Sequence, residues 1–282
     1  MTKIGAGLLS ALMLLVAASD SARATNPVSL YRIAFQDRFV TDVFINGHGP
    51  FTFVIDSASS RTIIYEHVRA QLGLKASEPD PITVYGINQQ ARAMAIAPDR
   101  LNVGGQDIAS LTMGVLPDTG ESGDPDGVLG IDVLSRYFVV LDRAGMQLRL
   151  LPRDGGAAKA YTRWDQVALT PRALTNIPVD FWYVTMAVNG HVIQALFDLG
   201  AGITLLNWPA AERLGVERRA ASRKYGPPPE GLRDVLGKIA PAVVVKDVTI
   251  TFPDQAWRKQ DILVSDAPVF EFFGMGEKPG AI

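Results

Sequence analysis

The sequence contains no cysteine, which excludes disulfide bonds, thiolate nucleophiles, cysteine-ligated zinc and a lipidated cysteine. It has only three histidines, His48, His67 and His191, and no H-E-x-x-H motif. A net charge of −2 leaves no basic excess to neutralise phosphates, so nucleic acid is not an expected partner. The G-x-S-x-G elbow of serine hydrolases and the nucleotide-binding glycine motifs are also missing. Few catalytic chemistries remain open.

Long hydrophobic runs are scarce, and the longest lies at the start of the chain. "GLLSALMLLVAA" follows Lys3 and is too short to span a bilayer comfortably. Ala22 and Ala24 then form an A-x-A cleavage pattern. We therefore predict a signal peptide over residues 1–24, an exported protein, and no membrane association after cleavage. An uncleaved membrane anchor is the alternative.

The remaining composition predicts a packed, mainly β protein. Hydrophobic residues make up 48% and charged residues 20% of the chain. Helical spacing is brief: Ile64, Val68 and Leu72 recur every four residues before Gly73, and Asn207 is placed to cap a second short helix. Apolar runs bounded by turn residues predict strands at YRIAFQ, FVTDVFI, FTFVID, YFVVLD, MQLRLLP, WYVTMAV, IQALFD and AVVVKDVTITF.

An internal repeat organises the chain. "FVTDVFINGHGPFTFVIDSASSRTIIYEHVRAQLGL" resembles "WYVTMAVNGHVIQALFDLGAGITLLNWPAAERLGV". Both segments have NGH after a strand, an apolar strand running into Asp56 or Asp198, a threonine six residues later, and then a Leu-Gly pair. We predict two related lobes, 25–155 and 156–282, joined by the flexible stretch "PRDGGAAKAY".

The duplicated aspartate turns suggest a shared site. A pseudo-twofold axis would bring Asp56 and Asp198 face to face, where two close carboxylates cannot both ionise easily. The ionised carboxylate takes a proton from water, while the protonated one donates a hydrogen bond to the substrate carbonyl. This is general acid–base hydrolysis of an amide, and it needs neither a metal nor an organic cofactor.

With these motifs the chain resembles the retropepsin-like aspartic proteases, in their exported bacterial branch with two lobes, and is a more distant relative of pepsin. The family motif is Asp, Thr or Ser, Gly, then Ala or Ser, matched here by "DSAS" and "DLGA". "GVLGID" at Gly127–Asp132 resembles the apolar element that packs beneath the active turn, followed by a short helix and a hairpin.

The resemblance implies two pseudo-twofold-related β-barrel lobes with a few short helices, and an aspartic endopeptidase activity. Its expected substrate is an extended peptide or protein segment, its expected location the periplasm or the medium, and its expected state a monomer without cofactors. Asp56 and Asp198 are the predicted catalytic residues. The predicted supporting turn residues are Ser57, Ala58, Ser59, Leu199, Gly200 and Ala201.

The family also implies a hairpin flap over the cleft, and "PITVYGINQQARAMAIA" is the candidate. Tyr85 and Gly86 lie at its turn, where Tyr85 either touches substrate or is an ordinary cross-strand aromatic. "SRKYGPPPEGLRD" takes the corresponding place in the second lobe, and its prolines predict an irregular loop. Asp132 and Asp142 are interpreted as structural.

Three departures from the family pattern favour a rival function. Ala58 replaces a glycine, which predicts a strained turn, and Leu199 replaces the hydroxyl residue that holds the two turns in register. In "KPGAI" we expect Gly280, Ala281 and Ile282 to match Gly127, Val128 and Leu129, so the second lobe is expected to be truncated. The rival is a pseudoprotease that binds peptide segments between the lobes without cutting them.

Overall fold

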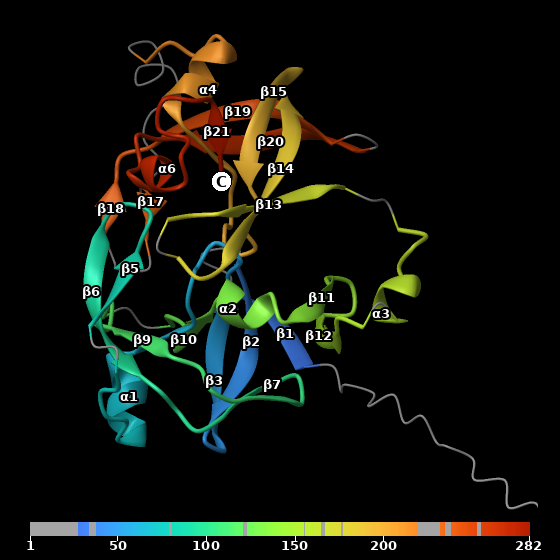
Figure 1. Cartoon of the computed structure of the whole chain (residues 1–282). Coiled ribbons are helices and arrows are strands. Elements are labelled where there is room, and N and C mark those ends of the chain that lie inside the picture. The colour runs from blue at the N-terminus through green and yellow to red at the C-terminus, as the bar shows by residue number, and fades with distance from the viewer. Residues whose placement is uncertain are drawn as a thin grey trace, which may run out of the picture.

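The computed structural model describes residues 28–33, 38–78, 81–120, 123–154, 156–164, 167–175, 177–218, 232–234, 238–252 and 255–282. These residues form two lobes, with the β1–β12 part of the chain below and the β13–β21 part above in Figure 1. No helix within the described ranges is long and apolar enough to cross a membrane. The predicted signal peptide, 1–24, lies outside the described residues.

The first lobe is built on a 12-stranded sheet in which β10 lies between β3 and β4. Its helices are α1 (Glu66–Leu72) and α2 (Ile131–Leu134), and α3 (Gly156–Lys159) follows it on the way to the second lobe. Its strands are β1 (Val28–Ile33), β2 (Arg38–Ile45), β3 (His48–Ile55), β4 (Ile63–Tyr65), β5 (Ile82–Tyr85), β6 (Gln90–Ile96), β7 (Leu101–Val103), β8 (Gln106–Ile108), β9 (Met113–Leu116), β10 (Gly127–Leu129), β11 (Tyr137–Asp142) and β12 (Gln147–Pro152).

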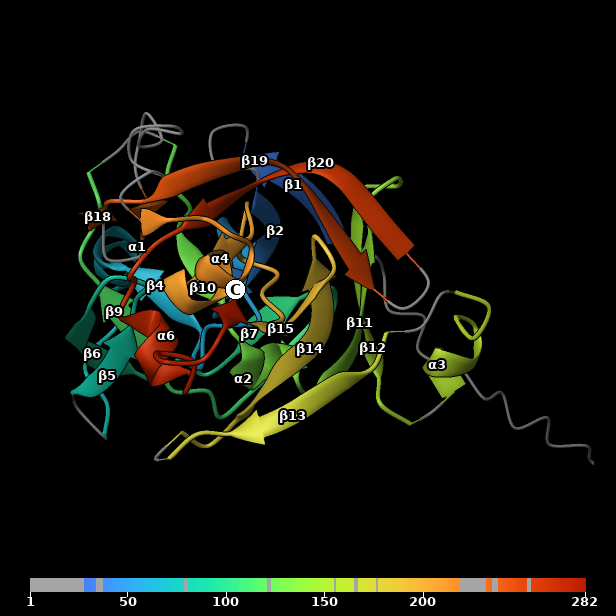
Figure 2. The same ribbon diagram turned by 90° about the horizontal axis from the view of Figure 1, so that it is seen from above.

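The second lobe has a seven-stranded sheet and a separate β17–β18 pair. Its helices are α4 (Trp208–Arg213) and α6 (Val269–Phe272). Viewed from above, β19 and β20 lie across the upper side of the molecule (Figure 2). Its strands are β13 (Leu169–Ala173), β14 (Asp180–Val188), β15 (His191–Leu196), β16 (Leu205–Leu206), β17 (Leu232–Arg233), β18 (Ile239–Ala240), β19 (Val243–Phe252), β20 (Gln255–Val264) and β21 (Gly280–Ala281).

The repeat in the sequence is a repeat in the strand pairing. In the first lobe β10 runs parallel to β3 and antiparallel to β4, and β4 runs parallel to β9. In the second lobe β21 runs parallel to β15 and antiparallel to β16, and β16 runs parallel to β20. The predicted fold class, mainly β with two related lobes and a few short helices, is confirmed.

One predicted register is wrong by a residue. Gly127 pairs with Phe53, and Ala281 pairs with Ala195. Phe53 and Ala195 each lie three residues before a site aspartate, so Ala281, not Gly280, takes the place of Gly127. Alanine fits opposite Ala195, whereas a Cβ on Gly127 would meet the Ile63 carbonyl oxygen and lie 2.6 Å from the Phe53 ring.

The short helices form largely as predicted. Gly73 ends α1 in the left-handed region at φ 63°, and its N–H donates to the Ala70 carbonyl. Asn207 caps α4 by accepting a hydrogen bond from the Ala210 N–H. The first helix begins later than its apolar spacing predicted, because residues 63–65 are taken up as strand β4 between β10 and β9.

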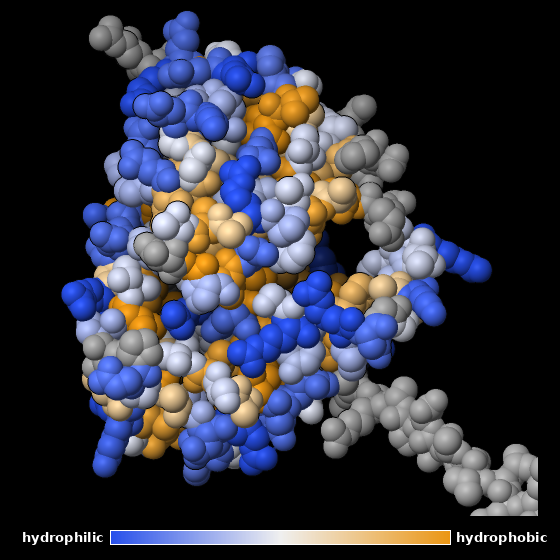
Figure 3. All heavy atoms as spheres, in the orientation of Figure 1, coloured by the Kyte–Doolittle hydropathy of each residue, from blue (hydrophilic) through white to orange (hydrophobic). Residues whose placement is uncertain are grey.

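A large hydrophobic core continues from one lobe into the other. It includes Ile55 and Leu129 of the first lobe and Phe181 and Phe273 of the second, whose rings meet edge to face with centroids 5.0 Å apart. Figure 3 shows hydrophobic side chains gathered in patches near the middle of the face drawn there, between more hydrophilic ends. The lobes are therefore held by shared apolar burial as well as by the linker.

Candidate active site

The two repeated strands deliver both aspartates to one cleft. Asp56 directly follows β3, and Asp198 lies two residues after β15. Both line the same cavity, together with Ala58, Ser59, Gly200 and Ala201. Each aspartate remains partly exposed, so the cleft floor is open to substrate. The structure thus brings together the residues that the repeat singled out, which lie 142 positions apart in the chain.

Asp56 is the better supplied with donors of the two aspartates. Its Oδ1 accepts hydrogen bonds from the backbone N–H groups of Ser59 and Ala58, both at 2.8 Å. Burial raises the pKa of Asp56, while these two bonds, the nearby Arg38 charge and a hydrogen bond from Asp198 pull it back down. The result is a carboxyl whose pKa is raised only in part.

The proton of the pair is favoured on Asp198. Burial and then the negative charge of Asp56 raise its pKa well above the usual range, whereas the Gly200 N–H, 2.7 Å from Oδ1, lowers it. The first turn gives Asp56 two backbone donors and the second gives Asp198 this one among the bonds described. The ionised state is therefore favoured at Asp56, and the protonated Asp198 donates to it.

Ser57 links the two turns across the pseudo-twofold axis. Its hydroxyl donates to the Phe197 carbonyl at 2.7 Å and accepts from the Leu199 N–H at 2.9 Å. Leu199 has no hydroxyl to make the reciprocal exchange, and its side chain packs against the core instead. The hydrogen bonds that the resemblance implied for Ser57 are therefore present. At the equivalent position of the second turn, the apolar packing of Leu199 replaces them.

The predicted strain at Ala58 is wrong. Ala58 is not among the residues with positive φ, so an alanine Cβ meets no backbone penalty in this turn. Glycine is required in the second turn instead, because a Cβ added to Gly200 would be 2.7 Å from the Asp56 Cγ. The second turn approaches the first carboxylate so closely that only glycine fits.

Asp132 and Asp142 have the structural settings expected of them. The Asp132 carboxylate accepts from the Thr62 hydroxyl at 2.8 Å and from the Thr62 N–H at 3.0 Å. Thr62 in turn accepts from the Gly130 N–H at 3.1 Å. Asp142 accepts from the Gly145 N–H in the β11–β12 turn. The Asp132 network ties α2 to the strand that follows the active turn.

The β5–β6 hairpin covers the cleft as a flap. Its turn is closed by a 2.8 Å hydrogen bond from the Gly86 N–H to the Gln89 carbonyl, and both Tyr85 and Gly86 line the cavity. Tyr85 stacks on Phe272 of the second lobe with ring centroids 4.0 Å apart. The tyrosine thus contacts an aromatic across the cleft rather than one across its own hairpin.

Asn88 fastens this flap to the second lobe, a contact that the sequence reasoning missed. Its side-chain amide donates to the carbonyls of Leu232 at 2.9 Å and Lys238 at 3.0 Å. Its backbone N–H donates to Asp234 at 3.1 Å, and the Ile87 carbonyl accepts from the Val269 N–H. Leu232–Asp234 ends the segment predicted to be irregular, and residues 222–231 of that segment lie outside the described part.

The histidines form no metal site. His48 and His191 are exposed at the starts of β3 and β15, and the described residues contain no cluster of three or more metal-ligating side chains. His67, for which we predict no role from the sequence, bridges Asp118 at 2.6 Å and Asp126 at 2.9 Å. Burial lowers the pKa of His67, but these hydrogen bonds outweigh it and raise the pKa overall.

Comparison with known proteins agrees with this geometry in the first lobe. Residues 41–133 match the family model described as "Aspartyl protease". The resemblance to aspartic proteases is thereby confirmed over a segment that contains Asp56 and the Gly127–Asp132 element, while Asp198 lies beyond it. No curated protein matches the sequence.

Two solved structures are loosely similar. The chain is 16% identical to a retropepsin-like aspartic protease from Rickettsia conorii, with a TM-score of 0.31 over 44% of this chain and 88% of that one. It is 9% identical to basic 7S globulin from soybean, with a TM-score of 0.41 over 84% of this chain and 81% of that one.

Proposed function

We propose that the protein is an aspartic endopeptidase that hydrolyses peptide bonds with Asp56 and Asp198. The observation that carries this proposal is the convergence of two carboxylates, from equivalent turns, in one accessible cleft where they share a hydrogen bond. Their unequal surroundings separate an ionised carboxylate from a protonated one. Such a separation is what assigns a general base and a general acid to a pair of like groups.

In this mechanism the ionised Asp56 takes a proton from a water molecule, which attacks the peptide carbonyl carbon. The protonated Asp198 donates to the carbonyl oxygen and stabilises the charge that develops there. The proton gained by Asp56 then passes to the amide nitrogen as the C–N bond breaks, and Asp198 recovers its proton from the gem-diol. No covalent intermediate forms.

The flap defines how a substrate enters. An extended peptide between the lobes pairs with strand-like backbone edges, and the flap closes over it. In the structure Tyr85 and Asn88 already hold the flap to the second lobe. An entering peptide must therefore break these contacts or pass beneath the flap. Tyr85 is positioned to contact the bound peptide.

The test is cleavage of a peptide library from pH 3 to pH 8 by the wild type, Asp56→Asn and Asp198→Asn. Loss of one member of an acid–base pair should lower kcat/KM by about a thousandfold. Asp107→Asn is the matched control, because Asp107 is an exposed carboxylate of the first lobe, on β8. Wild-type cleavage that survives either active-site substitution would overturn the proposal.

A second candidate is a pseudoprotease that holds a peptide without cutting it. Two observations favour it: the flap is fastened across the cleft, and Leu199 lacks the hydroxyl that would complete the exchange with Ser57. This candidate predicts saturable peptide binding without turnover by the folded protein. Binding should then be insensitive to Asp198→Asn, which keeps shape and hydrogen bonding while removing the acid.

Export and a monomeric state complete the proposal. The apolar segment before Ala24 would direct the chain to the periplasm or the medium, and one chain supplies both aspartates without a second copy. N-terminal sequencing of the exported protein should begin at Thr25. Size-exclusion chromatography with light scattering should give the mass of a single chain.

A further inference from the structure

The cleft carries positive charge on one of its two sides. Besides Asp56 and Asp198, the charged residues that line it within the described part of the chain are Arg38 and Arg61. Both are half-buried. With one proton shared by the aspartates, the cleft has a net charge of about +1 (−1 from the pair, +2 from the arginines).

Neither guanidinium has an ion-pair or hydrogen-bond partner among the described residues. Several other arginines do, at the surface: Arg69 with Glu66 at 2.6 Å, Arg218 with Asp266 at 2.8 Å and Arg100 with Asp107 at 3.5 Å. Arginine cannot lose its proton at accessible pH, so the charge in the cleft is permanent. Two half-buried guanidinium groups without a hydrogen-bond partner in the described part of the chain leave their N–H donors available to a ligand.

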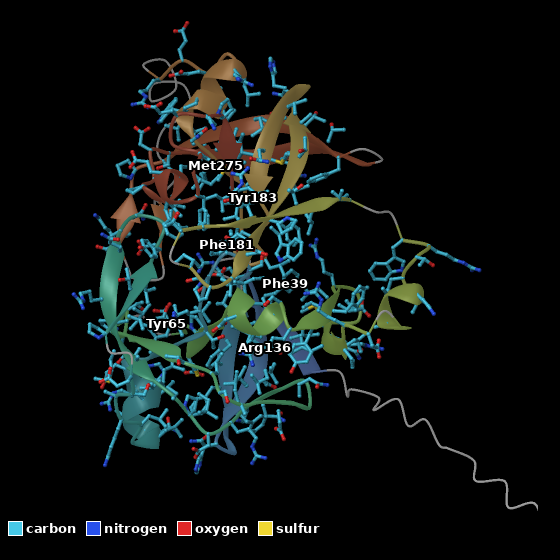
Figure 4. All side chains as sticks on the ribbon, in the orientation of Figure 1. Phe39, Tyr65, Arg136, Phe181, Tyr183 and Met275 are labelled. Atoms are coloured by element: carbon cyan, nitrogen blue, oxygen red, sulfur yellow. The ribbon has the colours of Figure 1, made fainter. Side chains whose placement is uncertain are left out.

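The pseudo-twofold axis makes the asymmetry plain. Arg38 directly precedes the first repeat and Phe181 directly precedes the second, and both line the cleft. Arg61 precedes Thr62 where Ile203 precedes Thr204. Figure 4 shows Phe181 near the boundary between the lobes. At both pairs of equivalent positions the first lobe has a cation and the second an apolar side chain.

The second-lobe side of the cleft is apolar beyond Phe181. Val269, Phe272 and Phe273 line it, and the Phe272 and Phe273 rings meet edge to face with centroids 4.9 Å apart. Phe181, Val269 and Phe273 are buried, whereas Phe272 is partly exposed. A peptide lying between the lobes therefore meets arginine donors along one part of its length and the Phe272 ring along another. Such a surface discriminates between peptides by charge as well as by size.

We infer that the cleft selects peptides that place a carboxylate against Arg38 and Arg61 and an apolar side chain against the Phe272 side. This inference rests on the proposed cleavage activity, which it refines by naming the substrate class. The planar guanidinium group matches a carboxylate through two parallel hydrogen bonds, which neutral amides cannot reproduce. The carboxylate is that of an aspartate or glutamate side chain, or that of a peptide C-terminus.

The experiment compares matched peptides on the wild type and on Arg38→Gln, Arg61→Gln and the double variant. One arm places Glu or Gln at each position flanking the scissile bond, and the other compares a free C-terminal acid with its amide. We expect the wild type to prefer the acidic peptide by about tenfold in kcat/KM, chiefly through KM. The double variant should lose that preference.

A control variant and the pattern of rates distinguish substrate recognition by the arginines from an effect on the aspartates. Arg100→Gln removes an exposed arginine of the same lobe and should keep the preference. Equal loss of rate on Glu and Gln peptides in Arg38→Gln and Arg61→Gln would mean that the arginines act on the aspartates alone, and would overturn the inference. A preference confined to the terminal arm identifies the C-terminus as the bound carboxylate. Raised salt should weaken either preference.

If the wild type cuts no peptide, the inference can still be tested by measuring peptide binding. Fluorescence anisotropy then measures binding of labelled Glu and Gln peptides to the wild type and the double variant. Selective binding of the acidic peptide that disappears in the double variant would support the inference while the proposed cleavage fails. Equal binding of both peptides would overturn it.

Discussion

The two lobes repeat one strand pattern with different side chains. Strands β3, β10, β4 and β9 pair in the same order and sense as β15, β21, β16 and β20. In the first lobe a phenylalanine lies opposite a glycine, Phe53 and Gly127, whereas in the second two alanines, Ala195 and Ala281, fill the same positions. Glycine is required at 127, because a Cβ there would meet the Ile63 carbonyl oxygen as well as the Phe53 ring, whereas the equivalent position of the second lobe holds alanine.

The same comparison at the active turns shows a division of tasks. The first turn stabilises a charge, since its backbone gives Asp56 two donors, and it supplies the bridging hydroxyl of Ser57. The second turn supplies the glycine that permits close approach and an aspartate held mainly in its protonated form. Equivalent positions therefore need not tolerate equivalent substitutions.

The largest difference that we expect between the two turns is between the effects of Gly200→Ala and Ala58→Gly. The new Cβ at 200 would lie 2.7 Å from the Asp56 Cγ and 2.9 Å from its Oδ2, so the carboxylate must move. We expect kcat/KM to fall about a hundredfold and the free energy of unfolding to fall by roughly 1–3 kcal/mol. Peptide cleavage and urea unfolding measure the two effects.

The reciprocal variant is the control. Ala58→Gly removes a Cβ from a turn without positive φ, so it should cost about 1 kcal/mol of stability through backbone freedom and leave catalysis of the same order. Equal loss of activity in the two variants would show that the turns approach each other symmetrically, contrary to the structure.

The helix caps give the next largest contrast. Tyr65 and Asn207 each lie nine residues after a site aspartate, and the Tyr65 side chain makes no capping bond. Buried Asn207 donates to the Met275 and Lys278 carbonyls, both at 2.6 Å, and accepts from the Ala210 and Gly280 N–H groups, both at 3.0 Å. It thereby joins α4 to the chain leading into β21.

Asn207→Ala leaves these four backbone groups, three of them in buried hydrogen bonds, without their partner. We expect the free energy of unfolding to fall by about 3 kcal/mol or more, measured by urea denaturation. Asn102→Ala is the matched control, because the Asn102 amide makes one exposed bond to Asp107 and should cost less than about 1 kcal/mol. Similar losses in the two variants would contradict the bridging role of Asn207.

Much of the fold was predictable because the repeat is a strong signal. Two apolar strands that each end in an aspartate, with a threonine six residues beyond, are difficult to reconcile with anything but duplicated lobes. The register of β21 was not predictable, because Gly280, Ala281 and Ile282 are all compatible with a buried strand. The strand pairing in the structure, Ala281 with Ala195, decides which residue takes the place of Gly127.

The site was predictable as a pair of carboxylates but not in its details. Symmetry placed Asp56 and Asp198 together, whereas a motif cannot reveal which turn needs its glycine, and so Ala58 was wrongly expected to be strained. The Asn88 contacts join residues about 145 positions apart with no local pattern to signal them. Arg38 likewise became part of the site only when β2 brought it beside the cleft.

Asp56 and Asp198 should also differ in their effects on the pH dependence of protein stability. Burial raises the pKa of both, and that of Asp198 by more, so the folded protein binds more protons than the unfolded chain above pH 3.8. Stability contributed by the protonated forms is present at low pH and is lost as pH rises through the raised pKa values. Asp198→Asn should therefore raise Tm at pH 7 more than Asp56→Asn does.

Thermal scans of both variants and the wild type from pH 4 to pH 8 check this ranking. Asparagine at 198 can still accept from the Gly200 N–H and donate to Asp56, so the comparison isolates the ionisation. The Tm difference between Asp198→Asn and the wild type should shrink toward pH 4. A difference that does not change with pH would rule out a raised pKa as its cause.

The smallest expected effect is a displacement of the pH–rate profile by Arg38→Gln. The Arg38 charge lowers the pKa of Asp56 and of Asp198 against the raising effect of burial. Removing it should move both limbs of a bell-shaped kcat/KM profile to higher pH, because the ionised form of each aspartate loses a favourable interaction. Arg38 is the arginine whose charge is among the main influences on both pKa values, so Arg61→Gln should move the limbs less while still weakening the acidic preference. Limbs that move equally in the two variants would show that both arginines act through the aspartates, and the charge difference between the lobes would then concern catalysis rather than substrate choice.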